Sequence, residues 1–317
     1  MGIDSEQLIM DAIVPFLSPA IGQIFQQIDP QQLKSLEEIR LRNGQPLLLK
    51  IGEQELPVNQ QGDLDKELRA AYVVKADDIY RSILSISDNS LYAFEEEIRR
   101  GFITIPGGHR VGLAGQVVME NGQIKTIKDF SSVSFRIARQ VKGCAQSLLP
   151  QIYRQHKQPT STLLISAPRC GKTTILRDLA RFISDGSSWG PPCTVSLIDE
   201  RSELAGTYRG KVQMDLGRRT DVLDACPKAL GMMMAIRALG PQVIIADEIG
   251  RREDVEALQE CMNAGVNVIT SLHARDIEEA QRRPLIKELL AAGVFQTLIT
   301  LSRRQGPGTV EEIVRWD

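Results

Sequence analysis

The stretch 162–181, TLLISAPRCGKTTILRDLAR, decides how the rest of the chain is interpreted. It opens with β-branched and aliphatic residues, which predict a short buried strand. A tight loop follows at 166–173 and ends in the tripeptide GKT. From Ile175 onward the apolar residues recur at helical spacing, so a helix is expected after the loop. A strand, a loop ending in GKT and a helix are together the context of a phosphate-binding P-loop.

The chemistry of phosphate explains why these residue types stand at these positions. A helix that starts near Gly171 leaves its first amides unpaired, and its positive dipole end faces the loop. Glycine also permits a close approach of the main chain. Lys172 can bring its ammonium to the β- and γ-phosphates, and the Thr173 hydroxyl can ligate Mg²⁺. We predict a nucleotide site formed by Ser166, Ala167, Pro168, Arg169, Cys170, Gly171, Lys172, Thr173 and Thr174.

The loop departs from the usual pattern at its first position. That pattern, G-x-x-x-x-G-K-[ST], opens with glycine, whereas this chain has Ser166 there. A serine is tolerated if its φ angle is negative. Arg169, in the middle of the loop, faces either phosphate or a neighbouring subunit. The alternative interpretation is a chance GKT at the start of a core helix.

A second strand, predicted at 242–248, ends in two carboxylates. Its four apolar residues indicate a central parallel strand, and ligands bind at the carboxyl edge of such a sheet. Asp247 would hold Mg²⁺ through water, and Glu248 would orient and polarise the attacking water. Asp199-Glu200 ends a similar strand and competes for this role. We prefer the later pair because its strand is more uniformly apolar and a turn at Gly250 follows.

A third predicted strand, 267–273, brings His273 to the same edge of the sheet, and a helix is expected after it at 277–292. Its imidazole is either a structural group at a strand end or a sensor of the γ-phosphate. The nucleotide is expected to be ATP, because no guanine-reading [NT]KxD tetrapeptide follows the P-loop. The similar VKAD at 74–77 precedes the loop and begins with valine.

Length and composition indicate a two-domain globular protein. The chain has 317 residues, of which 42% are hydrophobic and 25% charged. Its formal net charge of −2 argues against a bulk binder of nucleic acid or anionic membrane. Five cysteines without a CxxC pair suit a reducing cytoplasm. We expect domains at 1–150 and 151–317, joined through the Gly-, Pro- and polar-rich segment 143–160, whose polar run is 154–159.

The first domain is expected to be α+β, with strands between 36 and 58, helices at 77–87 and 89–100, and further strands to 139. Residues 1–25 suggest an amphipathic helix packed on that domain, with docking to a membrane partner as the alternative. Several arginines alternate with apolar residues on the strands. They form a solvated face, or one or two of them reach a nucleotide at a domain or subunit boundary. These arginines are Arg40, Arg42, Arg110, Arg136 and Arg139.

Several stretches resemble the stage III sporulation protein AA family, whose members are ATPases of endospore-forming bacteria. They include EIRLRNGQPL, YAFEEEIRRGFIT, GGHRVGLAGQVV, the P-loop, IDERSELAG, SLHA and the long segment GRRTDVLDACPKALGMMMAIRALGPQVIIADEIG at 217–250. The resemblance covers nearly everything from residue 36 onward. It implies a part in the channel between mother cell and forespore, and a cytoplasmic location, either free or at the inner membrane through partner proteins.

At greater distance the chain resembles the type II and type IV secretion ATPases. This resemblance implies an α/β fold with a RecA-like P-loop domain after a smaller N-terminal α+β domain. It aligns their acidic box with Asp199 through Glu203, their catalytic glutamate with Glu248 and their histidine box with His273. It also implies hexamers, in which arginines of the N-terminal domain act across subunits. Two positions depart from the secretion ATPases, Val266 and Asp247, where those motors often carry histidine and glycine.

The leading hypothesis is an ATPase motor that works on a membrane channel or secretion complex. In it Lys172, Glu248, His273 and Glu203 serve catalysis, and Thr173 and Asp247 hold Mg²⁺. A second hypothesis is an oligomeric scaffold that binds ATP with little turnover. A third is an ATPase stimulated by nucleic acid through the basic loop at 204–222. That loop offers Tyr208 alone for base stacking, so no stable nucleic-acid partner is expected.

Overall fold

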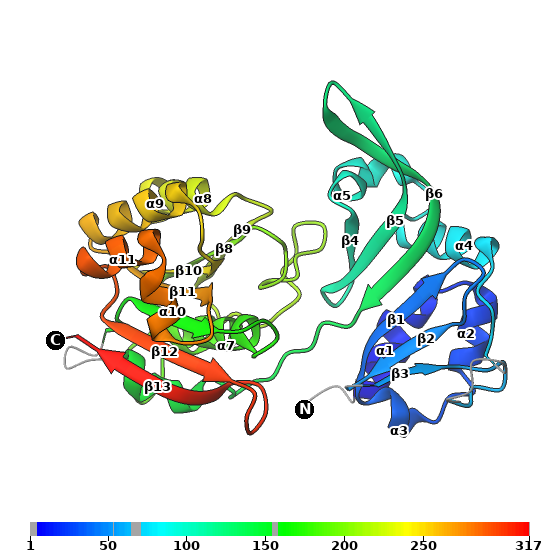
Figure 1. The fold of residues 1–317 in the computed structure, drawn as a ribbon, viewed down its shortest axis with the longest axis horizontal. Coiled ribbons are helices and arrows are strands. Elements are labelled where there is room, and N and C mark those ends of the chain that lie inside the picture. The colour runs from blue at the N-terminus through cyan, green and yellow to red at the C-terminus, as the bar shows by residue number, and fades with distance from the viewer. Residues whose placement is uncertain (1–4, 53, 65–70, 154–157, 317) are drawn as a thin grey trace. The chain divides into compact units, whose positions relative to one another are not determined.

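A computed structural model of the chain describes residues 5–52, 54–64, 71–153 and 158–316. Residues 1–4 of the predicted N-terminal helix and 154–157 of the predicted polar linker lie outside the described residues. The chain divides into two compact units, Met1–Arg139 and Gln140–Asp317. Each unit is built around its own sheet (Figure 1).

The first unit has a six-stranded sheet among the described residues, in the order β3-β2-β1-β6-β5-β4, and every pair is antiparallel. Its strands are β1 (Leu36–Arg42), β2 (Leu48–Ile51), β3 (Gln54–Pro57), β4 (Phe102–Ile105), β5 (His109–Glu120) and β6 (Gln123–Arg136). Its helices are α1 (Ser5–Ala12), η1 (Val14–Phe16), α2 (Pro19–Phe25), α3 (Pro30–Leu33), α4 (Ala76–Ile86), η3 (Leu91–Phe94) and α5 (Glu95–Arg99).

Alternation of apolar and polar residues, as at Ile39 to Arg42 of β1, gives this sheet two different faces. Ile39, Val111 and Phe135 are fully buried, and they pack with residues of α1, α2 and α4 in one core. The residues between them on the strands point to the opposite face, because successive side chains of a strand alternate. The outer halves of β5 and β6 pair only with each other, and this hairpin projects past the sheet (Figure 1).

The second unit has a seven-stranded sheet among the described residues, in the order β13-β12-β7-β11-β10-β8-β9. All neighbours are parallel except the pair of β12 with β13. Its strands are β7 (Thr162–Ser166), β8 (Val195–Asp199), β9 (Thr220–Asp224), β10 (Val243–Glu248), β11 (Asn267–His273), β12 (Thr297–Ser302) and β13 (Thr309–Arg315). Its helices are η4 (Gln146–Leu148), α6 (Leu149–Ile152), α7 (Lys172–Asp185), α8 (Lys228–Ala238), α9 (Arg252–Asn263), α10 (Ile277–Arg282) and α11 (Pro284–Ala291).

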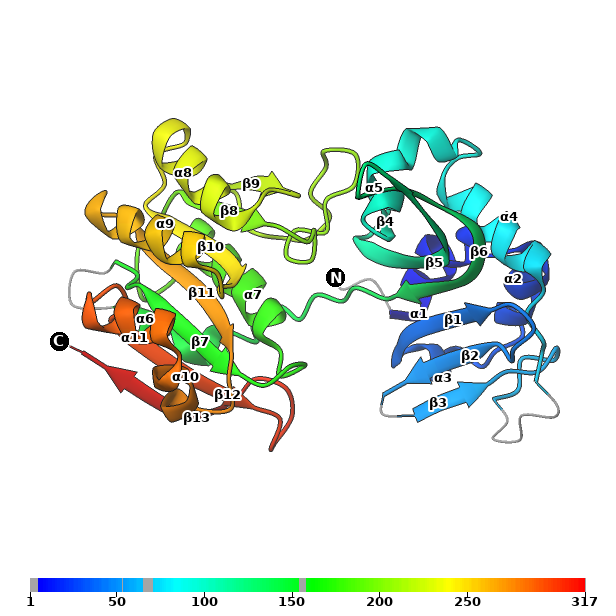
Figure 2. The same ribbon diagram turned by 45° about the horizontal axis from the view of Figure 1, so that its top comes forward.

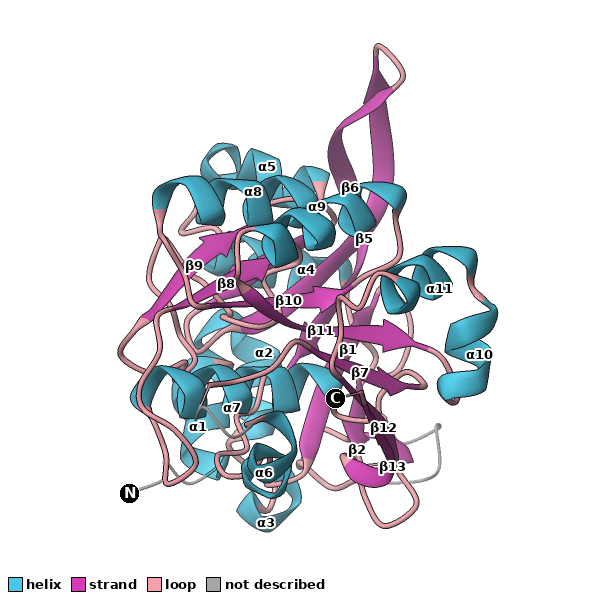
Figure 3. Cartoon of the chain, turned by 90° about the vertical axis from the view of Figure 1, so that its left-hand side faces the viewer, coloured by secondary structure: helices cyan, strands magenta, loops and turns pink. Residues whose placement is uncertain are grey.

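Helices cover both faces of the parallel sheet. α6 and α7 lie on one face, and α8, α9 and α11 lie on the other (Figures 2 and 3). The strands are therefore buried on both sides, and their sequences are continuous apolar runs such as the fully buried Val243–Ala246. In the central strands the carboxylates Asp199, Asp247 and Glu248 stand at the strand ends, where the chain emerges from the core.

Two local predictions were wrong. The region 204–222 was expected to be loop, but Thr220–Asp224 forms the edge strand β9 beside β8. Residues 277–292 were expected to form one helix, but it is split into α10 and α11 at Pro284. Proline disfavours helical geometry in the preceding residue, and Arg283 accordingly has φ −80° and ψ 122°.

Candidate functional site

The P-loop joins β7 to α7. Ser166 is the last residue of β7, where it pairs with His273 of β11 and Leu301 of β12, so its backbone is extended. Gly171 precedes the first helical residue with φ 88°, a left-handed conformation that suits glycine. Arg169 adopts φ 63°, which costs a non-glycine residue about 1 kcal/mol. The loop thus has the turn geometry that brings the first amides of α7 toward a bound anion.

Lys172 is 6% exposed, and polar groups around its ammonium hold it in place. Four acceptors lie around its Nζ atom: Ser166 O at 3.1 Å, Ser166 Oγ at 3.0 Å, Ala167 O at 3.2 Å and His273 Nδ1 at 2.8 Å. Burial lowers the pKa of Lys172, while the charges of Glu248 and Asp247 act in the opposite direction. The ammonium therefore faces the acidic residues of the site.

The contact between Lys172 and His273 fixes the tautomer of the imidazole. An ammonium can only donate, so His273 Nδ1 accepts and the ring proton lies on Nε2. His273 Nε2 is 3.2 Å from Glu248 Oε2 and donates to it. Nδ1 also lies 3.4 Å from Ser166 O, and a hydrogen bond there would need the proton on Nδ1. We assign the proton to Nε2 because the contact with Lys172 is shorter, at 2.8 Å. His273 thus bridges the lysine of the P-loop and the carboxylate of β10.

Both carboxylates come from the end of β10, as predicted from the sequence. The first part of the strand is fully buried, and only Asp247 and Glu248 at its end are partly exposed. Thr270 Oγ1 donates to Asp247 O at 2.7 Å, and Ser271 Oγ donates to Asp247 Oδ1 at 3.4 Å. These bonds from β11 orient Asp247 at the edge that β10 and β11 share with the P-loop strand.

The P-loop, β10 and β11 meet in a single cavity of about 450 Å³. It is large enough for the triphosphate and part of a nucleoside, since small-molecule sites start at about 300 Å³. Thr173 and Asp247 supply hydroxyl and carboxylate oxygens, the donor types that Mg²⁺ prefers, so these residues fit such an ion. The lining residues are Pro168, Arg169, Gly171, Lys172, Thr173, Thr174, Arg201, Glu203, Asp247, Glu248, His273 and Pro307.

Asp199, the first carboxylate of the competing pair, is turned away from this cavity. It is 1% exposed, and its two oxygens accept hydrogen bonds from Glu203 N at 2.9 Å and Ala205 N at 2.8 Å. Burial raises the pKa of Asp199 to about 6, although these backbone donors lower it. Its contacts fix the loop that carries Glu203 into the cavity.

Glu200, the second member of that pair, lines a neighbouring cavity of about 290 Å³. It forms ion pairs with Lys228 and, at 3.8 Å, with Arg251. Its charge is therefore compensated by two cations, whereas Glu248 faces His273. The assignment of the catalytic role to the pair at the end of β10 stays a prediction.

Most of the predicted P-loop residues line the cavity, but three of them do not. Ser166 and Ala167 contribute through their contacts with Lys172, and Cys170 is buried beneath the loop with its thiol directed at Pro168 O. Two lining residues were missed, Arg201 and Pro307. Arg201 directly follows the acidic end of β8, and this position at a strand end could have predicted it as a residue of the site. Pro307 has no local signal, because only the pairing of β12 with β7 brings it to the P-loop.

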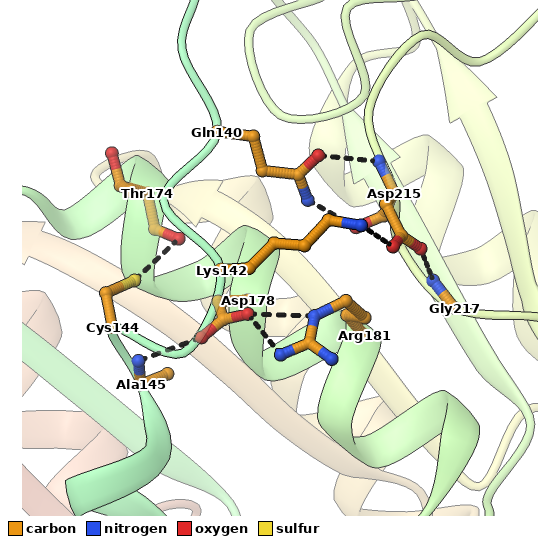
Figure 4. A network of polar contacts seen from close by, with 9 residues as sticks. All are labelled: Gln140, Lys142, Cys144, Ala145, Thr174, Asp178, Arg181, Asp215 and Gly217. Carbon is orange, nitrogen blue, oxygen red and sulfur yellow. Dashed lines mark hydrogen bonds and ion pairs between the residues drawn. The ribbon is translucent and has the colours of Figure 1, made fainter. Parts of the chain in front are cut away.

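The first residues of the second unit are bonded to α7 (Figure 4). Asp178, 1% exposed, accepts a hydrogen bond from Ala145 N at 2.9 Å and is paired with Arg181 at 2.7 Å. Cys144 Sγ lies 3.7 Å from Thr174 O, in the first turn of α7. Burial raises the pKa of the Cys144 thiol to about 11, so it remains protonated at neutral pH.

The same segment is also bonded to the loop before β9 (Figure 4). The amide of Gln140 donates to Asp215 O at 2.7 Å and accepts from Asp215 N at 3.0 Å. Lys142 Nζ lies 2.5 Å from Asp215 Oδ2. We call residues 140–145 with their partners on α7 and at Asp215 the linker clamp.

The first unit has a cavity of its own, of about 280 Å³, on the face of the sheet opposite its core. Four of the five predicted arginines line it: Arg40, Arg42, Arg110 and Arg136. Arg139 lies apart, because β6 ends at Arg136 and the Arg139 guanidinium donates to Leu36 O at 2.9 Å.

Two of the four arginines have partners within this face. Arg40 pairs with Glu38 at 2.8 Å, and Arg110 stacks 3.6 Å from the centroid of the Phe102 ring. Burial would raise the pKa of Glu38, but hydrogen bonds from Ser134 and Arg40 outweigh it and the pKa is lowered. Arg42 and Arg136 form no ion pair or hydrogen bond with the side chains that the structure describes. Their charges are therefore available to an external anion.

Two solved structures with a similar fold are an ATPase and a pilus retraction motor. The Legionella pneumophila ATPase DotB is 16% identical, with a TM-score of 0.56 over 84% of this chain and 72% of that one. The pilus retraction motor PilT, solved with bound ADP, is 15% identical, with a TM-score of 0.55 over 90% of this chain and 81% of that one. The chain therefore has the α/β, RecA-like fold of the secretion ATPases, which confirms the predicted fold class.

Sequence comparison gives the family. The sequence pattern of the family described as "Sporulation stage III, protein AA" matches residues 9–316. The stage III sporulation protein AA of Bacillus subtilis (strain 168) is 43% identical over 305 residues, which are 96% of this chain and 94% of that protein. The chain belongs to the stage III sporulation protein AA family, as the resemblance implied. Within the described residues, no helix is both long and apolar enough to cross a bilayer.

Proposed function

We propose that the protein is an ATPase that drives or gates a membrane channel or secretion complex during endospore formation. One observation carries the proposal: Lys172 and Thr173 of the P-loop line the same cavity as Asp247, Glu248 and His273. Membership of the sporulation family and the secretion-ATPase fold support the cellular role. The protein itself acts in the cytoplasm and reaches the membrane through partner proteins.

In this proposal the P-loop binds the phosphates. The first amides of α7 and the Lys172 ammonium replace the phosphates' hydration, and Lys172 exchanges its contact with His273 for one with phosphate. Thr173 and Asp247 would hold Mg²⁺, and the ion would supply neutralisation of the phosphate charge. Glu203, fixed by Asp199 and by Arg177 through its main chain, contributes a third carboxylate at the rim.

Glu248 accepts the proton of the attacking water in this mechanism. His273 keeps the Glu248 carboxylate in position through its Nε2 proton, at 3.2 Å. Its other ring nitrogen, Nδ1, becomes free once Lys172 moves to phosphate. His273 is therefore suited to sense the γ-phosphate, since departure of the lysine changes the hydrogen bonding of the same ring that holds Glu248.

We further propose that the active form is a homo-oligomer, a hexamer, in which the first unit of one copy supplies arginines to the nucleotide of its neighbour. Arg42 and Arg136 are the preferred residues, because Arg40 is paired with Glu38 and Arg139 with main-chain carbonyls. An arginine near the γ-phosphate stabilises the charge of the transition state.

The test is Glu248→Gln in the full chain, measured by ATP binding and by phosphate release at a concentration that permits oligomers. We expect binding to be retained and turnover to fall about 10²–10⁴-fold, the usual contribution of a general base. Glu253→Gln, on an exposed position of α9, is the matched control and should turn over normally. Equal hydrolysis by Glu248→Gln would overturn the assignment. A wild-type protein that binds ATP but hardly hydrolyses it would favour the nucleotide-dependent scaffold instead.

A further inference from the structure

The tip of the β12–β13 hairpin, residues 303–308, forms one wall of the nucleotide cavity. β12 runs parallel to β7, with Leu301 opposite Ser166, so the hairpin turns beside the P-loop. Pro307 is the residue of this tip that lines the cavity. Among the lining residues in the described part of the chain, it alone follows β11, and its apolar ring stands beside charged residues such as Lys172 and Glu203.

The main chain of the tip packs directly on the start of α7. A Cβ atom added to Gly171 would lie 3.4 Å from both Gly308 N and Pro307 Cβ. A Cβ atom added to Gly308 would lie 3.3 Å from Ile175 Cδ1. Both glycines have positive φ angles, 88° and 90°, so other residues would be strained there as well. The tip is therefore closely apposed to the P-loop.

Hydrogen bonds hold the tip in one shape. Arg304 Nε pairs with Glu311 Oε1 at 3.0 Å. Thr309 Oγ1 accepts from Gln305 N at 3.1 Å and donates to Gly306 O at 2.7 Å. Pro307 is therefore presented by an ordered turn, and packing against it loses little conformational entropy.

The strand order gives a bound nucleotide its direction. Glu248 and His273 end β10 and β11, on one side of β7, whereas the hairpin lies on the other side. A phosphate that is to be attacked must face Glu248 and His273. The rest of the nucleotide then extends from Lys172 toward the opposite side of the P-loop, where Pro307 lies.

We propose that Pro307 and the adjoining main chain of the tip form the platform on which the nucleoside part of the nucleotide packs. The inference rests on the proposed function, because it assumes a triphosphate on the P-loop. The pyrrolidine ring contacts the flat face of the base or the ribose. Pro307 therefore sets affinity for the nucleoside and leaves phosphate binding to Lys172.

The experiment compares two probes on the full chain, Mg·ATP and inorganic triphosphate with Mg²⁺. Pro307→Ala removes the ring, and we expect ATP to bind about tenfold more weakly while triphosphate binding is unchanged. Gln305→Ala changes an exposed side chain of the same turn that does not line the cavity, and it should alter neither affinity.

Each outcome separates this inference from the proposed function. If Pro307→Ala weakens both probes equally, the tip only supports the shape of the P-loop and the platform is wrong. Unchanged ATP affinity in that variant would also overturn it. If the wild-type protein binds neither probe, the nucleotide site itself fails, and the platform fails with it.

Discussion

The two sheets of this protein place their charged residues in different ways. In the parallel sheet of the second unit, the central strands are buried on both faces, so the residues of the candidate site stand where a strand ends. In the antiparallel sheet of the first unit, alternate side chains leave the core, and arginines spread across a whole face. At the carboxyl edge of the parallel sheet, residues that are distant in sequence lie together in one cavity. A face instead spreads several arginines over a broad surface, where Glu38 pairs with one of them.

The comparison predicts that the edge of the second unit is indispensable for nucleotide binding. Lys172→Ala should abolish detectable ATP binding and lower turnover about 10³-fold, because the phosphates lose their principal cation. Lys287→Ala, on an exposed position of α11, is the matched control. Calorimetric binding and phosphate release measure the two effects. Retained ATP affinity in Lys172→Ala would mean that the P-loop is not the site.

The arginine face should matter for turnover without contributing to binding by a single copy. Replacing both Arg42 and Arg136 by alanine is expected to lower turnover of the assembled protein about 10²-fold, the effect of losing a charge-stabilising donor. ATP affinity at concentrations below assembly should not change. Arg81→Ala, an exposed arginine of α4, serves as the control. Loss of affinity in the dilute double variant would contradict the division of labour between the two units.

The two units should also differ in acid stability, because His109 is fully buried in the first unit. Burial, with the nearby charge of Arg139, lowers the pKa of His109 to about 4 from its usual 6.5. As the pH falls, the unfolded chain therefore binds a proton on His109 before the folded chain does. The folded state is consequently stable with neutral His109 above pH 6.5, and it loses free energy of unfolding as the pH falls toward 4. Between pH 7 and 4.5 the loss is roughly 2 kcal/mol.

His109→Asn tests this effect. In the wild-type protein Ala138 N donates to His109 Nδ1 at 3.0 Å, and the amide oxygen of an asparagine can accept the same hydrogen bond. Hydrogen exchange of peptides from β5 and β6, followed by mass spectrometry, should accelerate with acid more steeply in the wild type than in the variant, after correction for intrinsic rates. Identical pH profiles would show that His109 does not titrate in this window.

The smallest predicted effect concerns how tightly each sheet packs against its surroundings. A Cβ atom at Gly231 of α8 would lie 2.5 Å from Ile198 Cγ2, whereas one at Gly112 of β5 would be 3.9 Å from the nearest atom. Gly231→Ala should therefore destabilise the second unit by about 1–2 kcal/mol through overpacking. Gly112→Ala should be nearly neutral. Thermal unfolding monitored by Trp189 and Trp316, both in the second unit, reports the first change.

Sequence patterns identified the central part of the site because its residues stand directly after recognisable apolar strands. Ser166, Glu248 and His273 each end such a run, and parallel strands bring their ends to one edge. The edge strand β9 was missed because it is only half-buried, so Asp221 and Asp224 made it look like loop. Edge strands need fewer apolar residues, and the pattern is correspondingly weak.

Other features depend on tertiary contacts that no local pattern encodes. Asp199 and Glu248 stand at equivalent strand ends, yet the loop after Asp199 folds back and donates two amides to it. Pro307 reaches the P-loop only through the register of β12 with β7. The arginines of the first unit were predicted as a group, but their pairing with Glu38, Phe102 or main-chain oxygens was not predictable from alternation alone.

The linker clamp attaches the helix of the P-loop to the chain segment that precedes it. Ala145 is tied to Asp178, two turns into the helix that begins with Lys172, and Cys144 touches the first turn at Thr174. Gln140 and Lys142 at the start of the same segment are bonded to Asp215, so the clamp holds this segment to two separate parts of the second unit. Gln140 directly follows Arg139, the last residue of the first unit, so the second unit is anchored to its own nucleotide-binding helix from its first residues onward.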